Sequence, residues 1–263
     1  MATYDEIYQN YLDKGPVAPD AFDGRLLYAV EGDLLLDDLA LQEYSRARAK
    51  RETGATDPDA REGLVAMTDD AGSIIRWRPG LVLTYVVCKA LFTELARYNT
   101  AVTTMAEATA GWESLCGVEF RHLDALDTDP NPIGQCLFTV REVLPYKSVV
   151  AAAFFPNYPV WRRQVILMPS FFTFTSPDPV GVLRHELGHV LGFRHEHIRS
   201  EAPAVCPDED IDNILPLTPF DPQSVMHYFC GGAGSTDLGF TTKDEEGALI
   251  VYGPPHSRFA YYE

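Results

Sequence analysis

Residues 185–195 read HELGHVLGFRH, and their spacing restricts the local fold more than any other feature of the chain. On a helix, His185 and His189 lie one turn apart on the same face, where their imidazoles can share a metal ion. Imidazole nitrogen is a common ligand of zinc. Glu186 lies next to His185 and can lean toward that metal without binding it.

The third histidine of this segment, His195, cannot reach the same metal from a continuing helix. Six more helical residues would rotate it by about 600° from His189 and carry it about 9 Å along the axis. The helix must therefore end before His195. Gly192 stands where the chain has to turn back, and glycine readily adopts the left-handed backbone that ends helices.

Three histidine ligands leave a coordination position for water, which is typical of a catalytic zinc site. We therefore predict Zn²⁺ as the cofactor, bound by His185, His189 and His195. Zinc lowers the pKa of its bound water toward about 7, and Glu186 is the predicted general base that takes the water proton. The alternative is that these histidines are only surface residues of a helix.

Composition argues against several other classes of function. The 263 residues are 46% hydrophobic and 22% charged, which suits a globular protein with a sizeable core. The net charge of −17 opposes binding to nucleic acid and to anionic membranes. No apolar stretch reaches the roughly 18 residues of a membrane span. We expect a monomer without nucleic-acid or membrane partners.

The five cysteines include no CxxC pair, which argues against a cysteine zinc site. An odd number leaves one cysteine unpaired if disulfides form, and the alternative is five buried free thiols in a reducing compartment. The first ten residues, MATYDEIYQN, lack the basic and apolar regions of a secretory signal.

Hydrophobic patterning predicts an α+β fold, in which one twisted sheet packs against two long helices and an irregular C-terminal part follows. The second long helix should begin at Ser176 or Asp178, and a last helix near Thr242. The first long helix has an apolar face formed by Met105, Ala108, Trp112 and Leu115. Strands are expected at 81–88, 118–123, 135–140, 149–155 and 162–168.

The basic stretch 46–63, which also contains Gly and Pro, is the one clear break in composition. We interpret it as an exposed linker and a proteolysis site. The alternative is a helix end that runs into a surface loop. We place the domain boundary after it, with an N-terminal segment of residues 1–74 and a domain of residues 75–263.

The extended motif at 185–195 is that of the metzincin zinc peptidases, and residues 75–253 resemble that clan. The resemblance implies a zincin-like fold: a twisted, mixed five-stranded sheet with an antiparallel edge strand, two long helices and an irregular C-terminal subdomain. SVMHY (224–228) resembles the methionine turn, which would make Met226 a hydrophobic floor beneath the histidines. A plain core methionine is the alternative.

Among metzincins the sequence is most similar to the astacins, and IRWRPGLVLTYVV (75–87) resembles the start of their catalytic domain. By this resemblance Tyr228 is an extra zinc ligand that swings to bind the oxyanion, although it could be only a packed side chain. Glu196, directly after the third histidine, would anchor the processed N-terminus.

Two disulfides are predicted, with Cys88 left free. The spacing of Cys116 and Cys136 resembles that of an astacin disulfide. A bond between Cys206 and Cys230 would tether the loop between the third histidine and the methionine turn.

Other segments depart from the astacin pattern. After Glu196 the chain reads HIRSEAP, which differs from the usual astacin continuation. The segments AAAFFP (151–156) and TTKDEEGALIVYG (241–253) instead resemble matrix metalloproteinases. The chain therefore resembles a bacterial-type metzincin near the astacins. VVAAAFF (149–155) is expected to be the edge strand above the cleft, which a peptide substrate would extend as an antiparallel strand. An interior strand is the alternative.

YAVEGDLLL (28–36) resembles the FxGD motif of astacin prosegments, with Val30 in place of the phenylalanine. In that family the aspartate reaches the zinc, so the resemblance makes residues 1–74 an inhibitory prosegment with Asp33 as a zinc ligand of the latent form. Gly32 would let the backbone pass close to the cleft. A cut near Arg46–Arg61 would activate the chain. The alternatives are a simple turn at Gly32–Asp33, or Cys88 as the blocking ligand.

The sequence thus predicts a zinc-dependent metalloendopeptidase, latent until its prosegment is cleaved, that acts on peptide or protein substrates. A zinc hydrolase acting on a non-protein amide is one alternative. A binding module that keeps zinc without catalysis is another, against which the intact Glu186 argues. The family resemblance implies a secreted protein, and a cytoplasmic protein is the alternative.

Overall fold

The structure is a computed structural model that describes residues 3–20, 22–51, 64–144, 149–199, 201–206 and 213–258. In chain order, its helices and strands are α1 (Tyr4–Lys14), β1 (Ala18–Pro19), β2 (Leu26–Val30), β3 (Leu34–Asp37), α2 (Asp38–Arg51), β4 (Val65–Met67), β5 (Val82–Val87), α3 (Leu95–Leu115), β6 (Glu119–His122), β7 (Phe138–Glu142), β8 (Ala151–Ala152), β9 (Gln164–Leu167), α4 (Pro179–Val190), β10 (Phe193–Arg194), β11 (Ile214–Pro216) and α5 (Thr242–Tyr252).

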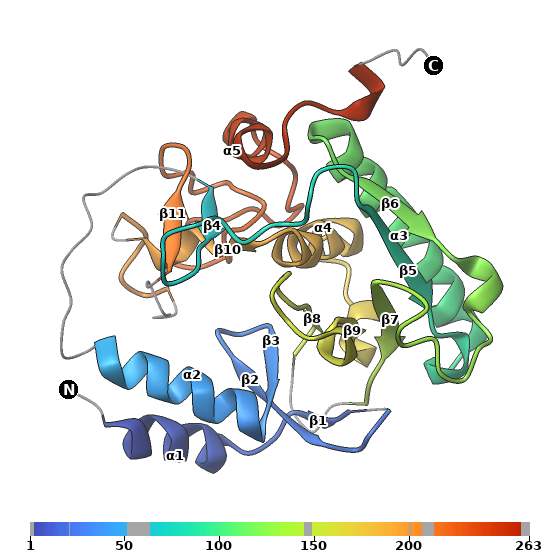
Figure 1. Cartoon of the computed structure of the whole chain (residues 1–263), viewed down its shortest axis with the longest axis horizontal. Coiled ribbons are helices and arrows are strands. Elements are labelled where there is room, and N and C mark those ends of the chain that lie inside the picture. Colours follow the sequence, from blue (N-terminus) through green and yellow to red (C-terminus); the bar gives the residue numbers. More distant parts are fainter. Residues whose placement is uncertain are drawn as a thin grey trace.

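A five-stranded sheet forms the framework of the C-terminal part (Figure 1). Its order is β6-β5-β7-β9-β8, and all pairs are parallel except β8, which runs antiparallel to β9 at one edge. The predicted mixed sheet with an antiparallel edge strand is therefore confirmed. The edge strand is shorter than the expected 149–155, and the next residue, Ala153, bridges to Leu34 of the N-terminal segment.

Helices α3 and α4 pack against each other and, with the sheet, enclose the main core. Met105, Ala108 and Trp112 of the predicted apolar face of α3 are fully buried, and Leu115 packs at the margin of the core. The Trp112 indole N–H also donates to the Arg184 carbonyl of α4, at 2.9 Å. Two long helices on one sheet are thus confirmed.

Local sequence signals fix both ends of α4. Asp178, rather than Ser176, is the N-cap, and its carboxylate accepts the backbone N–H groups of Val180 and Gly181. The helix ends at Val190, and Gly192 has a φ of 95°. A side chain at Gly192 would also collide with the Ile75 carbonyl, so the turn that redirects the chain requires glycine.

A second, three-stranded sheet has the order β10-β4-β11. Its central strand β4 comes from the predicted prosegment, yet Val65 and Ala66 are completely buried and pair with β10, which lies directly before His195. Residues 65–67 therefore belong structurally with the C-terminal part, ahead of the expected boundary at residue 75.

The linker expected at 46–63 also needs a correction, because α2 continues to Arg51. Residues 46–51 are rich in Ala, Arg and Lys, which favour helix, and a basic last turn suits the negative end of the helix dipole. The remaining positions, 52–63, lie outside the described residues.

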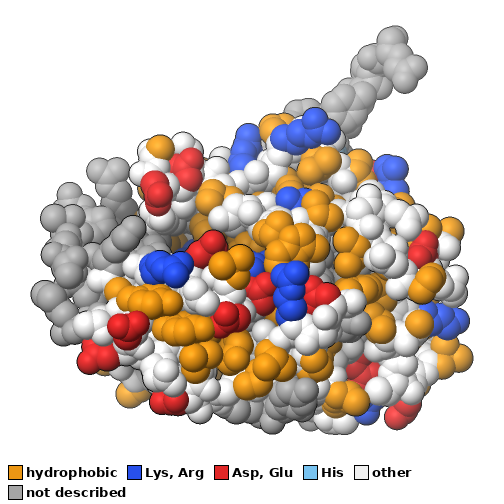
Figure 2. Space-filling view, turned by 60° about the horizontal axis from the view of Figure 1, so that its bottom comes forward, with side chains coloured by type: hydrophobic (Ala, Val, Ile, Leu, Met, Phe, Trp, Pro, Cys, Tyr) orange, Lys and Arg blue, Asp and Glu red, His pale blue; other side chains and the backbone are white. Residues whose placement is uncertain are grey.

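The N-terminal segment packs beside the antiparallel edge of the large sheet, below it in Figure 1. It contains α1, α2 and the antiparallel sheet β1-β2-β3. Leu27 and Leu35 share a buried cluster with Ile166 and Met168 of the C-terminal part. The face that this segment presents carries interspersed apolar, acidic and basic side chains (Figure 2). Within the described ranges, no helix is both long and apolar enough to cross a membrane.

The cysteines agree only in part with the predicted pairing. Cys206 and Cys230 form a disulfide, and Cys88 is free and buried. The predicted bond between Cys116 and Cys136 is wrong, since both are free thiols. Cys116 ends α3 in the main core, whereas Cys136 clusters with Cys88 and Val86. Neighbouring residues of β5 contribute to the two clusters, so the sheet lies between these cysteines.

Candidate metal centre

Four side chains from distant parts of the sequence converge on one point. The Nε2 atom of His195 lies 3.1 Å from Nε2 of His189 and 3.2 Å from Nε2 of His185. The Oδ2 atom of Asp33 lies 3.1, 3.4 and 3.0 Å from Nε2 of His185, His189 and His195. All four residues are buried. Tetrahedral ligands at about 2.0–2.1 Å from zinc lie roughly 3.3 Å apart, so this donor set fits zinc.

Backbone carbonyls fix the orientation of two of the imidazoles. Nδ1 of His185 lies 2.7 Å from the Val225 carbonyl, and Nδ1 of His189 lies 2.9 Å from the Phe193 carbonyl. A carbonyl oxygen can only accept, so each Nδ1 is the donor and each Nε2 offers its lone pair to a metal. Burial also lowers the pKa of His189 to about 4, which favours its neutral form.

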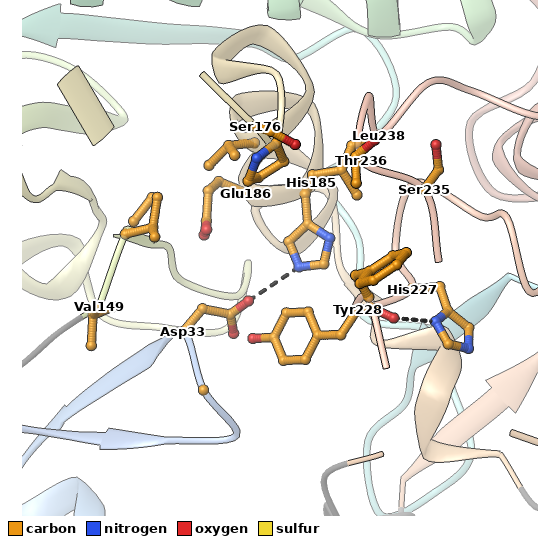
Figure 3. A pocket seen from close by; sticks show the side chains of 16 residues that line it. Asp33, Val149, Ser176, His185, Glu186, His227, Tyr228, Ser235, Thr236 and Leu238 are labelled. Carbon is orange, nitrogen blue, oxygen red and sulfur yellow. Dashed lines mark hydrogen bonds and ion pairs between the residues drawn. The ribbon is translucent and has the colours of Figure 1, made fainter. Parts of the chain in front are cut away.

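Asp33 reaches the histidines from the turn between β2 and β3. Gly32 and Asp33 therefore do lie in a turn, and this turn carries the carboxylate into the centre (Figure 3). Burial raises the pKa of Asp33, but the neighbouring His195 and His189 outweigh it and hold the pKa well below its usual range. Its Oδ1 atom is buried without a hydrogen-bond partner among the described residues, which leaves a second oxygen for a cation.

Glu186 lies beside the histidines on α4 and faces a cavity of about 570 Å³. Its side chain is buried, and Oε2 has no hydrogen-bond partner in the described structure. Burial and the nearby Asp33 carboxylate raise the pKa of Glu186 well above its usual value. A carboxylate with raised proton affinity at the mouth of a cavity suits a general base.

The Tyr228 hydroxyl is engaged by the N-terminal segment. It donates to the Glu31 carbonyl at 3.1 Å, and its ring stacks on His185 and His197. A side chain at position 32 would collide with this hydroxyl, so Gly32 permits the close passage of the turn. The Tyr228 hydroxyl is thus bonded to the backbone of the turn that carries Asp33.

Met226 is completely buried beneath the histidine-bearing helix. Its sulfur packs against Gly188, where any larger side chain would collide with it. Asp244 of α5 holds the adjoining turn by accepting the Ser224 hydroxyl at 2.6 Å and the Val225 N–H at 3.0 Å. Sequence reasoning overlooked both Gly188 and Asp244, although a glycine inside an amphipathic helix signals close packing.

Glu196 is completely buried behind the third histidine. Its Oε1 accepts the Asp221 backbone N–H at 2.9 Å, and burial raises the pKa of Glu196 to about 8.

Cys88, the rival candidate for a blocking ligand, lies with Cys136 in a separate cluster, whereas Asp33 is the fourth member of the metal-ligating group. The rival prediction of Cys88 as a blocking ligand is therefore not supported.

Two further residues near the centre were not foreseen. The carboxylate of Glu31 accepts a 2.8 Å ion pair from the guanidinium of Arg194, one residue before His195. Spacing along the chain gave no signal for this pair, because its members are 163 residues apart.

Two curated proteins match this chain over short regions. The chain is 36% identical over 69 positions to the Dorsal-ventral patterning protein tolloid of Drosophila melanogaster, and 41% identical over 64 positions to an astacin-like metalloendopeptidase of Coturnix japonica. These matches cover 19% and 18% of this chain, but only 6% and 15% of the two relatives. No protein-family model matches the chain.

Solved zinc-protease and related structures align over more of the chain. Myroilysin superposes with a TM-score of 0.49 at 14% identity, covering 72% of this chain and 98% of that one. High choriolytic enzyme 1, a hatching enzyme zinc-protease from Oryzias latipes, gives a TM-score of 0.44 at 18% identity, covering 72% and 99%.

Proposed function

We propose that this astacin-type metzincin is a zinc-dependent endopeptidase held in a latent state by its own N-terminal segment. The observation that carries the proposal is the convergence of the Nε2 atoms of three histidines beside Glu186, which faces an open cavity. His185, His189 and His195 would hold the zinc, and the two measured Nδ1–carbonyl contacts support their metal-binding tautomer. When bound, zinc supplies Lewis acidity and a water nucleophile at neutral pH.

The roles of the surrounding residues follow from their positions. Glu186 accepts the proton of the attacking water and delivers it to the leaving amine, and its raised pKa suits both steps. Met226 supports the histidines from below, and Glu196 steadies the segment that follows His195 through Asp221.

Tyr228 is proposed to stabilise the oxyanion once the N-terminal segment leaves. Its ring already lies against His185 and His195, so its hydroxyl needs only to exchange the Glu31 carbonyl for another acceptor. The hydrogen bond from such a donor becomes stronger as negative charge develops on the oxyanion, so it stabilises the transition state more than the ground state.

Latency is assigned to Asp33 within a prosegment of residues 1–74, whose strand β4 and residue Leu34 both pair with the C-terminal framework. A carboxylate is a good zinc ligand, and Asp33, grouped with the three histidines, would take the ligand position that the catalytic water needs. Activation would follow cleavage near Arg46–Arg61, at the end of α2 or in the positions beyond it.

A peptide or protein is the proposed substrate, and the chain is proposed to act as a monomer outside the cell. The disulfide between Cys206 and Cys230 supports an oxidising compartment. The edge strand β8 offers backbone groups to an extended peptide, which favours a peptide over a non-protein amide.

The test compares wild type with Glu186→Gln and, as a matched control, the exposed Glu94→Gln. Each full chain is folded, cut within residues 52–63, and assayed with quenched-fluorescent peptides and for zinc by elemental analysis. We expect one zinc per chain in all three proteins. The rate of peptide hydrolysis should fall by about 10²–10⁴-fold in Glu186→Gln and stay unchanged in Glu94→Gln. Wild-type activity in that variant would refute the mechanism.

A further inference from the structure

The strands of the large sheet are buried on both faces. In β9, Val165 and Leu167 belong to the main core, whereas Ile166 lies in a separate buried cluster. In β5, Val87 belongs to the main core, whereas Val86 lies in a further cluster. Neighbouring residues of a strand point to opposite faces, so both faces of the sheet are covered. Helices α3 and α4 pack on the main-core face, and the opposite face, here called the outer face, needs a cover of its own.

The N-terminal segment supplies much of this cover. In Figure 1 the segment lies below β8 and β9, whereas α4 lies above them. One buried cluster joins four apolar residues of the segment to four of the C-terminal part, and none of the eight is more than 8% exposed. They are Val17, Ala18, Leu27 and Leu35 of the segment, and Val143, Ala152, Ile166 and Met168 of the C-terminal part. Without the segment, this apolar surface would face water.

A buried charge lies in the middle of the outer face. Arg141 belongs to β7, the central strand of the sheet, and its side chain is 0% exposed. Burial lowers the pKa of Arg141 to about 10, so the guanidinium stays charged at neutral pH. Its Nη2 donates to Asp20 Oδ2 at 3.0 Å, and the Phe22 ring covers it at 5.6 Å. The carboxylate that pairs with Arg141 therefore comes from the N-terminal segment.

Hydrogen bonds hold Asp20 in one position. Its Oδ2 also accepts the Gln164 amide at 3.0 Å, and Gln164 Oε1 in turn accepts the Nε–H of Arg141. Its Oδ1 accepts the Phe22 backbone N–H at 2.8 Å. Nη1 of Arg141 has no hydrogen-bond partner among the described residues. Arg141 thus depends on Asp20, and this group of side chains fixes how the segment lies across β7 and β9.

A sheet of this kind is difficult to form with one face bare. Its parallel strands pair residues that are distant in the sequence, which slows folding, and apolar surface exposed meanwhile promotes aggregation. We propose that the N-terminal segment is the folding template of the C-terminal part: it covers the outer face while the sheet forms, and Asp20 fixes its position by neutralising Arg141. This function differs from latency and does not require the chain to be a peptidase.

The first test measures refolding of the uncut chain from denaturant with its disulfide intact. Asp20→Asn keeps the size of the side chain but leaves Arg141 buried without an anion, so the folded-to-unfolded ratio should fall by about 10²–10³-fold. Asp23→Asn is the matched control, because Asp23 belongs to the same loop but pairs with the exposed Arg25. It should change the ratio by less than about fivefold. Equal effects of the two substitutions would overturn the role of Asp20.

A double variant separates the lost charge from general damage. Arg141→Met, combined with Asp20→Asn, removes the buried guanidinium and keeps an unbranched apolar side chain in its place. Replacing a buried ion pair with apolar groups is often neutral for stability. The double variant should therefore regain most of the folded-to-unfolded ratio that Asp20→Asn loses. A double variant no more stable than Asp20→Asn would contradict the assignment to the charge of Arg141.

The template function is tested on a chain cut within residues 52–63 after folding, then unfolded and refolded with both pieces present. Glu186→Gln is present throughout, so that the samples do not digest themselves. The uncut chain should refold equally well at every protein concentration, whereas the cut chain should refold less as it is diluted, because its pieces must meet. Amide hydrogen exchange of α3 is the readout, since α3 packs on the opposite face of the sheet.

Adding free N-terminal segment should restore refolding of the diluted cut chain. The same segment with Asp20→Asn should need about a hundredfold higher concentration, and the segment with Asp23→Asn should act like wild type. Refolding of the cut chain that does not depend on concentration would show that the C-terminal part folds alone, and would overturn the proposal.

Discussion

At the scale of single residues, the site is defined by which acceptor each donor meets. Nδ1 of His185 and of His189 is committed to a backbone carbonyl, which leaves Nε2 for the metal. Asp33 lies in the remaining space with one oxygen against all three imidazoles. The same turn also engages the hydroxyl of Tyr228, so one short segment masks both the metal position and the proposed oxyanion donor.

Replacing Asp33 with alanine should make the intact chain hydrolyse added peptide sooner than wild type, because the carboxylate no longer competes for the metal. The measurement is the initial rate of an uncut sample whose integrity is checked by gel. Asp37→Ala is the matched control, since Asp37 belongs to the same segment but pairs with Arg162 and Arg25. Equal rates for Asp33→Ala and wild type, or full activity of uncut wild type, would argue against latency.

Tyr228→Phe should mainly lower turnover of the activated enzyme, by about 10–10³-fold, while KM changes little. The ring, which stacks on His185 and His197, is kept in this variant, so the change removes only the hydroxyl. Steady-state kinetics on one neutral peptide measure the effect. A loss confined to KM, or no loss, would mean that the tyrosine is only packed there.

At the scale of helices and strands, two elements hold the centre in place. Helix α4 supplies two histidines and Glu186, and the turn at Gly192 after its end leads through β10 to the third histidine. Helix α5 supports the methionine turn through Asp244, which also completes the capping box with Thr241. One buried carboxylate therefore joins the start of α5 to the floor of the site.

Asp244→Ala should lower the free energy of unfolding by about 2–4 kcal/mol, because it leaves the Ser224 hydroxyl and the Val225 N–H without their acceptor. Zinc should also be lost more readily to a chelator. Denaturant unfolding and chelator titration measure the two effects. Glu245→Ala, at the partly exposed next residue of the same helix, should cost less than about 0.5 kcal/mol. Similar costs for both variants would contradict this account.

At the scale of the whole molecule, the N-terminal segment contributes to the core as well as covering the cleft. Asp20 pairs at 3.0 Å with Arg141, a side chain that is 0% exposed. Leu27 and Leu35 bury Ile166 on the outer side of the sheet edge. Release of the segment would expose this surface, so its removal should both activate and destabilise the C-terminal part.

Three buried thiols should make the stability of the whole molecule depend on pH in the alkaline range. Burial raises the pKa of Cys88 and Cys116 to about 12 and that of Cys136 to about 11. Unfolded thiols titrate near about 8.5. Between these values the unfolded chain has lost protons that the folded chain retains, so the free energy of unfolding should fall as pH rises from about 9 toward 12.

Denaturant unfolding at successive pH values tests this expectation, and Cys116→Ala should reduce the slope above about pH 9. Thiol titration of the unreduced, denatured chain should find three free thiols. A single free thiol would instead indicate a second disulfide and contradict the free state of Cys116 and Cys136. A slope that does not change in the cysteine variant would assign the alkaline effect to other groups, such as Tyr85, whose pKa burial raises to about 12.

The sequence alone determined the features that depend on local spacing. The one-turn separation of His185 and His189, the glycine before His195 and a cap at Ser176 or Asp178 all act within a few residues, where helix geometry leaves little choice. The mixed five-stranded sheet, its antiparallel edge strand and the start of the last helix followed from patterning together with family resemblance.

Only the tertiary structure decided which distant side chains meet. Cys116 and Cys136 have a suggestive spacing, but the sheet lies between them. Glu31 and Arg194 have no relation in the sequence, yet the packing of the β2–β3 turn against β10 brings their charges to 2.8 Å. Such contacts depend on how a hairpin, a sheet edge and a helix end are placed in space, and residue spacing along the chain does not encode that placement.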